Sequence, residues 1–107
     1  MSLGEESPGG PFEAADPLLE HRVRLAACVL LSRGEEISFS RFKELLQQTD
    51  GNLGAQLRKL EDAGYIGLRK VFEARKPVTW YHLTASGRDA LGRHLQQLRQ
   101  LVAQARV

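Results

Sequence analysis

The chain is poor in cysteine, in aromatic residues and in long apolar runs. Its 107 residues include one cysteine and 7% aromatic residues. A single cysteine excludes a disulfide within one chain and makes a metal site built on paired thiolates unexpected. The longest apolar run, Leu25 to Leu31, is far shorter than the roughly 20 residues that a membrane helix requires. No charged-then-apolar leader is present either, so we expect a cytoplasmic protein without a membrane partner.

Patterns typical of enzymes and metal sites are also missing. The sequence has no Gly-rich phosphate loop, no nucleophile elbow and no carboxylate pair spaced for acid–base chemistry. His21, His82 and His94 are scattered, and no two of them are four residues apart as a helical metal site would require. We therefore expect no catalytic residue, no cofactor and no metal. Cys28, surrounded by apolar residues, is expected to be a small core residue rather than a redox sensor.

Acidic residues are scarce in most of the chain. Residues 1–17 hold Glu5, Glu6, Glu13 and Asp16 with no Lys or Arg, so 13 minus these 4 leaves 9 acidic residues against 15 basic ones in the remainder. Such a surplus favours a polyanionic partner, although charge alone indicates association rather than sequence-specific binding.

The N-terminal residues 1–15 are rich in Gly, Pro, Ser and Glu, and we predict a disordered tail there. Residues 16–107 are predicted to form one domain. Asp16 and Pro17 form a typical helix start, and the first helix is expected to run to Ser32 or Arg33 and to end at Gly34. Its apolar residues cover a wide arc, so one side is predicted to pack on the domain and the other to await a partner.

Two further helices are predicted at residues 40–48 and 51–63, separated by the turn-forming run Thr49 to Asn52. In the second of them, Leu53, Leu57 and Leu60 recur at helical spacing and form a stripe that must be buried. Asn52, Ala55, Gln56 and Lys59 are then expected to face outward. An amide that can pair with a base edge, a small residue and a cation suit a helix in a DNA major groove, while the alternative is an ordinary solvated helix face.

After Gly64 the apolar period changes to two. Strands are predicted at residues 65–72 and 78–83, joined by a basic tip at residues 73–77. Ile37, in the short segment 36–39, indicates a third strand only through its β-branch. The tip is expected to lie on the sugar-phosphate backbone or in a minor groove, the alternative being a solvated loop whose cations prevent edge aggregation.

The runs TDGNLGAQLRKLEDAGYI and RKVFEARKPVTWYHLTASGRDAL resemble winged helix-turn-helix regulators of the MarR/ArsR-like class. The shared pattern is L-x-K-L-E-x-A-G-Y-I, a basic hairpin and Y-x-L-T-x-x-G, and the likeness spans Pro17 to Leu95. Gly54 departs from it, because relatives commonly carry a polar residue there. The resemblance implies a dimeric prokaryotic transcription regulator and a third strand beside the hairpin. The expected fold class is α+β, mainly α: a winged helix-turn-helix with a small antiparallel sheet and a long C-terminal helix.

The last helix, at about residues 84–107, carries apolar residues at steps of three and four that are typical of a coiled-coil seam. We expect it to pair with its copy in a homodimer, the alternative being that it folds back on its own domain. The candidate dimer residues are Leu18, Leu19, Val23, Leu91, Leu95, Leu98 and Val102.

Double-stranded DNA is the expected partner besides a second copy of the chain. The candidate contacts are Arg41, Thr49, Asn52, Ala55, Gln56, Lys59, Arg69, Lys70, Arg75 and Lys76. The predicted function is a homodimeric, sequence-specific transcriptional repressor, with recognition helix 51–63 in the major groove and wing 69–78 on the backbone or minor groove. The alternative is a winged-helix module that binds another protein. The sequence does not identify a small-molecule effector.

Overall fold

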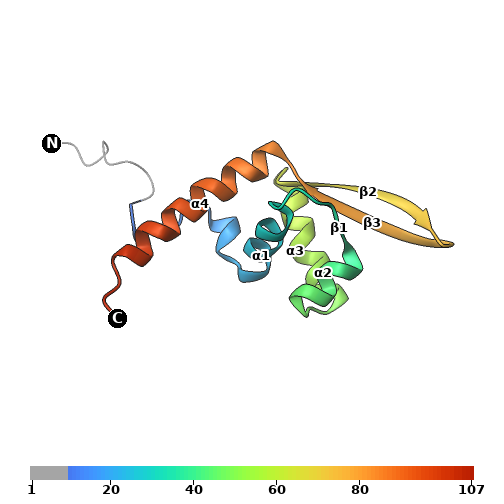
Figure 1. The fold of residues 1–107 in the computed structure, drawn as a ribbon, viewed down its shortest axis with the longest axis horizontal. Coiled ribbons are helices and arrows are strands. Elements are labelled where there is room, and N and C mark those ends of the chain that lie inside the picture. Colours follow the sequence, from blue (N-terminus) through green and yellow to red (C-terminus); the bar gives the residue numbers. More distant parts are fainter. Residues whose placement is uncertain (1–9) are drawn as a thin grey trace.

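The structure, a computed structural model, describes residues 10–107. Residues 1–9, most of the predicted disordered tail, lie outside the described residues. Helices form a compact body from which a hairpin and the C-terminal helix extend (Figure 1). The elements in chain order are the 3₁₀ helix η2 (Pro17–Glu20), α1 (Arg22–Leu31), β1 (Ile37–Ser38), α2 (Phe39–Leu46), α3 (Asp50–Asp62), β2 (Ile66–Glu73), β3 (Lys76–Leu83) and α4 (Ala85–Ala103). The predicted fold class, α+β and mainly helical, is confirmed.

The first predicted helix is divided in two, so the prediction of one continuous helix from Pro17 is wrong. Asp16 caps η2 by accepting a hydrogen bond from the backbone N–H of Leu18 at 3.0 Å. The chain is then extended at His21, whose Nδ1 accepts from the backbone N–H of Val23 at 3.2 Å and begins α1. A histidine ring that caps a helix was not distinguishable in the sequence from a residue within one.

The predicted helix-turn-helix is confirmed to within two residues. Ser38 caps α2 through a 3.1 Å bond from the Arg41 N–H, and Thr49 caps α3 through a 3.1 Å bond from the Asn52 N–H. Between the helices Gln47 is left-handed, with φ 52°, and it ends α2. Gly64, with φ +79°, follows α3 as predicted, since glycine adopts this conformation without steric cost.

The sheet is antiparallel with strand order β1-β3-β2, which confirms the third strand. The predicted five-residue tip is wrong, because β2 and β3 pair as far as Glu73 and Lys76. Only Ala74 and Arg75 form the turn, with φ of 51° and 66°, as in the two-residue turns that match the twist of a hairpin. Since β1 pairs with β3 only at Trp80 and Tyr81, Pro77 is tolerated on the unpaired edge of the described sheet.

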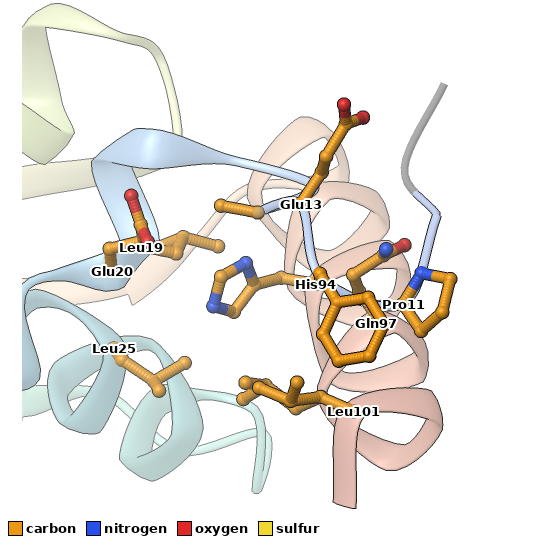
Figure 2. Close-up of a pocket in the computed structure, with 11 residues that line it drawn as sticks. Pro11, Glu13, Leu19, Glu20, Leu25, His94, Gln97 and Leu101 are labelled. Atoms are coloured by element: carbon orange, nitrogen blue, oxygen red, sulfur yellow. The ribbon is translucent and has the colours of Figure 1, made fainter. Parts of the chain in front are cut away.

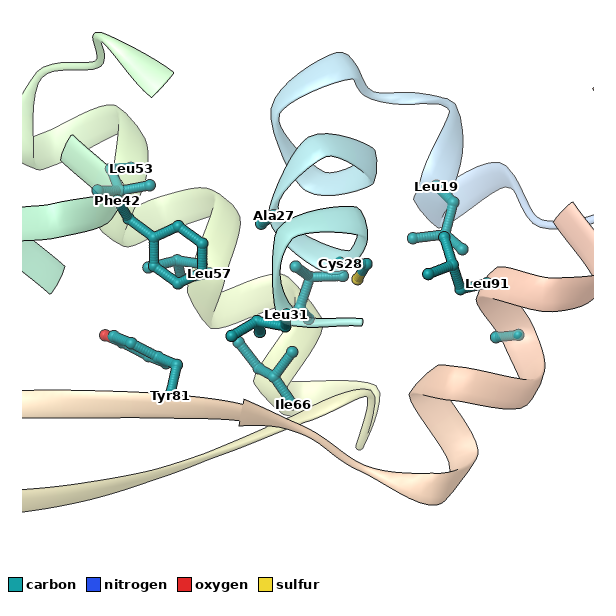
Figure 3. Close-up of a cluster of buried hydrophobic side chains, with 12 residues drawn as sticks. Leu19, Ala27, Cys28, Leu31, Phe42, Leu53, Leu57, Ile66, Tyr81 and Leu91 are labelled. Atoms are coloured by element: carbon teal, nitrogen blue, oxygen red, sulfur yellow. The ribbon is translucent and has the colours of Figure 1, made fainter. Parts of the chain in front are cut away.

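One apolar core joins the helices to the base of the hairpin (Figure 3). Leu53, Leu57 and Leu60 are buried in it, as predicted from their spacing. The Phe42 and Tyr81 rings meet edge to face, with centroids 5.9 Å apart. Cys28 is fully buried, which confirms its predicted place in the core. Within residues 10–107, the structure contains no helix that is long and apolar enough to span a bilayer.

Helix α4 begins at the base of the wing and runs out beyond the body on the far side from the hairpin tip (Figure 1). Thr84 caps it by accepting from the Gly87 N–H at 3.0 Å. The Thr84 hydroxyl also donates to the Gly64 carbonyl at 2.7 Å, which ties the start of α4 to the end of α3. The position of α4 relative to the helix-turn-helix is therefore fixed at one end.

Candidate nucleic-acid interface

One side of α3 is free of the core. Asn52, Ala55 and Lys59 are exposed, while the leucines on the other side are buried. The expected outward position of these three residues is confirmed. Thr49 is also exposed, and its hydroxyl caps the helix. The outer side of α3 thus presents the amide of Asn52 and the methyl group of Ala55 in its first turns and the ammonium of Lys59 in its last turn. These groups can meet base edges and phosphates.

Gln56 does not share this face, and the expectation that it points outward is wrong. Its side chain is 8% exposed, and its Oε1 accepts from Arg24 Nη1 of α1 at 2.5 Å. At about 100° per residue, Gln56 lies only about 40° from Leu60 and so borders the buried stripe. Arg24, which the sequence analysis did not select, supplies the donor that satisfies the buried amide. Gln56 is therefore not placed to touch a base.

Lys70, Arg75 and Lys76 are exposed basic side chains of the wing. Within residues 10–107 none of the three, nor Lys59, forms an ion pair with a carboxylate of the chain. Arg75 lies in the tight turn and Lys76 directly follows it. A shallow groove between α3 and the base of the wing is lined by residues that include Gly54, Arg58 and Lys70. The four cations without an ion pair among the described residues are free to contact phosphates beside α3.

Two other candidate cations are already paired. Arg69 donates to both carboxylate oxygens of Glu36, at 2.8 and 2.9 Å, and its guanidinium lies 5.9 Å from the centre of the Trp80 ring. The hydrogen bond from Arg69 lowers the pKa of Glu36 and raises that of Arg69 itself. Arg41 pairs with Glu44 at 3.3 Å. Exposed ion pairs contribute little to stability, so the pairing weakens Arg69 and Arg41 as phosphate contacts without burying them.

The candidate dimer residues separate into two groups. Leu19 and Leu91 are 0% and 4% exposed and pack in the chain's own core near each other (Figure 3), so placing them in a dimer interface is wrong. Leu18, Val23, Leu95 and Leu98 are partly buried, while Val102 is 71% exposed. The sequence pattern could not separate the two groups, because one stripe of α4 faces the body at its start and solvent at its end.

A cavity of about 190 Å³ lies between α4, η2 and residues 11–14 (Figure 2). His94 projects into it toward Leu19 and Glu20. The imidazole is 2% exposed, and its Nδ1 has no hydrogen-bond partner in the described part of the chain. The seam predicted on α4 did not include His94, because the pattern was built from apolar residues alone.

Comparison with known proteins is consistent with this geometry. The model of the winged helix DNA-binding domain family matches residues 23–102. An uncharacterized protein of Methanocaldococcus jannaschii is 34% identical over 79 residues, which cover 74% of this chain and 86% of that protein. The solved transcriptional regulator homologue protein from Pyrococcus horikoshii OT3 is 30% identical, with a TM-score of 0.74 over 80% of this chain and 85% of that chain.

More distant structures share the fold. Bacillus subtilis PadR, solved in complex with operator DNA, has a TM-score of 0.63 at 24% identity, covering 70% of this chain and 48% of that one. Structures of MarR from E. coli and of an ArsR family regulator are also similar, which confirms the resemblance drawn from the sequence. The chain therefore belongs to the winged-helix DNA-binding domain family, and its structural neighbours are transcriptional regulators.

Proposed function

We propose that the protein is a sequence-specific, double-stranded DNA-binding repressor that acts as a homodimer. The observation that carries the proposal is the exposed face of α3, with Asn52, Ala55 and Lys59, beside a wing whose Lys70, Arg75 and Lys76 are unpaired among the described residues. In this proposal α3 enters the major groove, and the wing contacts the backbone or the minor groove.

Homodimer formation is proposed from the apolar surface at the end of α4. Leu101 and Val102 are 42% and 71% exposed on the part of the helix that extends beyond the body. Apolar residues of this kind favour burial against a second copy of the helix. A two-fold dimer would present two α3 helices to successive major grooves, about 34 Å apart, and would select an inverted repeat. Occupying such a site would block transcription.

The rival function is binding of another protein, and one observation favours it. Phe72 lies near the wing tip and is 77% exposed, and an exposed aromatic side chain is typical of protein-binding surfaces. The same ring also suits insertion between base steps from the minor groove. The unpaired basic residues around it favour DNA over an apolar protein surface.

Selection of bound fragments from a random duplex pool, followed by fluorescence anisotropy, tests the proposal. We expect enrichment of one inverted repeat and tighter binding to it than to a shuffled duplex by about 1000-fold or more. Equal affinity for selected and shuffled duplexes would reject sequence-specific binding. Failure to bind any duplex at low salt would favour the rival.

A further inference from the structure

A continuous chain of hydrogen bonds connects η2 to the exposed face of α3. Arg24 Nε donates to the Leu18 carbonyl at 2.6 Å, and Arg24 Nη1 donates to Gln56 Oε1 at 2.5 Å. Gln56 Nε2 donates to Asn52 Oδ1 at 3.3 Å, and Asn52 Nδ2 donates to Gln48 Oε1. The chain ends where Gln48 Nε2 donates to the Leu46 carbonyl at 2.9 Å.

The groups at the two ends of this series of hydrogen bonds fix which way each amide within it is turned. A guanidinium has only donors, so Gln56 must turn its oxygen toward Arg24 and its NH₂ toward Asn52. A backbone carbonyl only accepts, so Gln48 must turn its NH₂ toward Leu46 and its oxygen toward Asn52. The Asn52 amide lies between the NH₂ of Gln56 and the oxygen of Gln48. Only one of its two orientations forms a hydrogen bond with both.

The fixed amide of Asn52 retains one unused N–H and one unused lone pair. The oxygen of a primary amide can accept two hydrogen bonds, and its NH₂ can donate two. Asn52 accepts one from Gln56 and donates one to Gln48. Its side chain is exposed in the first turn of α3, where recognition helices contact base edges. The remaining acceptor and donor complement N6 and N7 of adenine in the major groove.

We infer that Asn52 reads an adenine, and that Gln56 and Arg24 are positioning residues which hold its amide in the orientation that this base requires. This inference rests on the proposed function and specifies it further: an A·T base pair is the chemical feature recognised at Asn52. It also assigns a role to the buried Gln56, which acts through Asn52 without touching DNA.

Replacing Gln56 with glutamate separates positioning from packing. Gln56→Glu keeps an acceptor for Arg24 but has no N–H to give Asn52. Asn52 must then turn its own NH₂ toward the carboxylate, which breaks its hydrogen bond to Gln48 Oε1. The donor and acceptor offered to the base are then exchanged. Discrimination is the dissociation constant of a duplex with the A·T pair replaced by G·C, divided by that of the selected duplex. We expect this ratio to fall by about 5- to 150-fold. Asn52→Ala should lose the same discrimination.

A pair of Arg24 variants tests the inference without adding negative charge to α3. Arg24→Lys keeps a donor-only group facing Gln56, so base discrimination should be retained. Arg24→Met removes one of the two groups that fix the direction of the hydrogen bonds, and discrimination at that base pair should fall. Thermal unfolding and affinity for a shuffled duplex are measured alongside, because a merely structural role would change these and leave the preference at one base pair intact.

The outcomes distinguish the inference from the proposed function. A wild-type protein without any sequence preference would overturn both. A wild-type preference that Asn52→Ala leaves unchanged would overturn only the reading of adenine by Asn52. A preference lost in Asn52→Ala but retained in folded Gln56→Glu and Arg24→Met would overturn only the positioning role.

Discussion

Gln56 shows how a single buried amide changes which side chains α3 presents to solvent. Helical spacing placed it outside the leucine stripe, yet it is hydrogen bonded to Arg24, 32 residues earlier in the chain. Periodicity correctly predicted that Leu53, Leu57 and Leu60 are buried, because it reports the average direction of a face. It could not predict a partner on another helix, so residues at the edge of a stripe remained ambiguous.

Cys28 carries a prediction at the same scale. Burial, with a smaller effect of Asp16, raises the pKa of its thiol from 9.0 to about 12. The unfolded chain loses this proton at a lower pH than the folded protein does. The contribution of the protonated thiol to the free energy of unfolding is therefore complete below pH 9 and is lost as the pH rises toward 12. Between pH 9 and 10 the free energy of unfolding should fall by up to about 1.4 kcal/mol from this group.

The measurement for Cys28 is urea unfolding at several pH values, with Cys28→Ala as the control. Between pH 9 and 10 the free energy of unfolding of the variant should depend less on pH than that of the wild type. This range lies below 10.0, the ordinary pKa of tyrosine, and the pKa values of Tyr65 and Tyr81 are raised further in the folded protein. Native Cys28 should resist iodoacetamide at pH 8, because the thiolate is the reactive form. Rapid labelling of the folded protein would contradict the burial argument.

Two glycines on different helices give opposite predictions at the scale of the element. A Cβ on Gly54 of α3 would meet nothing within 4 Å, so Gly54→Ala should raise the free energy of unfolding by about 0.5–1 kcal/mol through helix propensity. A Cβ on Gly87 of α4 would lie 2.1 Å from the Tyr65 carbonyl oxygen, so Gly87→Ala should lower it by about 1–3 kcal/mol.

Chemical denaturation of the two variants beside the wild type measures both changes, and each variant is the matched control of the other. A stabilised Gly87→Ala would contradict the close approach of α4 to the end of α3. A destabilised Gly54→Ala would contradict the open groove between α3 and the wing.

The wing was predicted as an element but not in its detail. The change of apolar period at Gly64 correctly indicated a hairpin, but residues 73–77 were expected to form its tip. The strands extend further because the turn is made by Ala74 and Arg75, both with positive φ. Neither residue is among the Asn and Gly that usually signal such a turn, so the sequence contained no local sign of it.

At the scale of the whole molecule, the fold class and the family followed from local patterns, whereas surfaces formed by distant segments did not. Leu19 and Leu91 are 72 residues apart in number, and both are buried in the one core that the structure closes around them. Because α4 passes from the body into solvent, the same spacing of leucines serves the core at one end and an exposed surface at the other (Figure 1).

The exposed end of α4 gives a prediction of assembly. If it pairs with a second copy, size-exclusion chromatography with light scattering should give twice the chain mass of 11.9 kDa. Val102→Glu places a charge on the exposed apolar surface and should shift the protein to the monomer, because burying an unpaired carboxylate is costly. Gln104→Glu adds the same charge two residues later and should remain dimeric. A monomeric wild type, or a dimeric Val102→Glu, would contradict this interface.

We propose that the wing and the exposed side of α3 together bind DNA, and the salt dependence of binding to a selected duplex is the sharpest test of this proposal. Arg75→Gln with Lys76→Gln removes two wing charges. The control, called the α4 variant, combines Arg99→Gln in α4 with Arg106→Gln just beyond its end. The wing variant should bind more weakly, and its slope of log affinity against log salt should be smaller by about 2 per protomer. The α4 variant should match the wild type. Equal slopes for the wild type and the wing variant, or a loss confined to the α4 variant, would contradict the account.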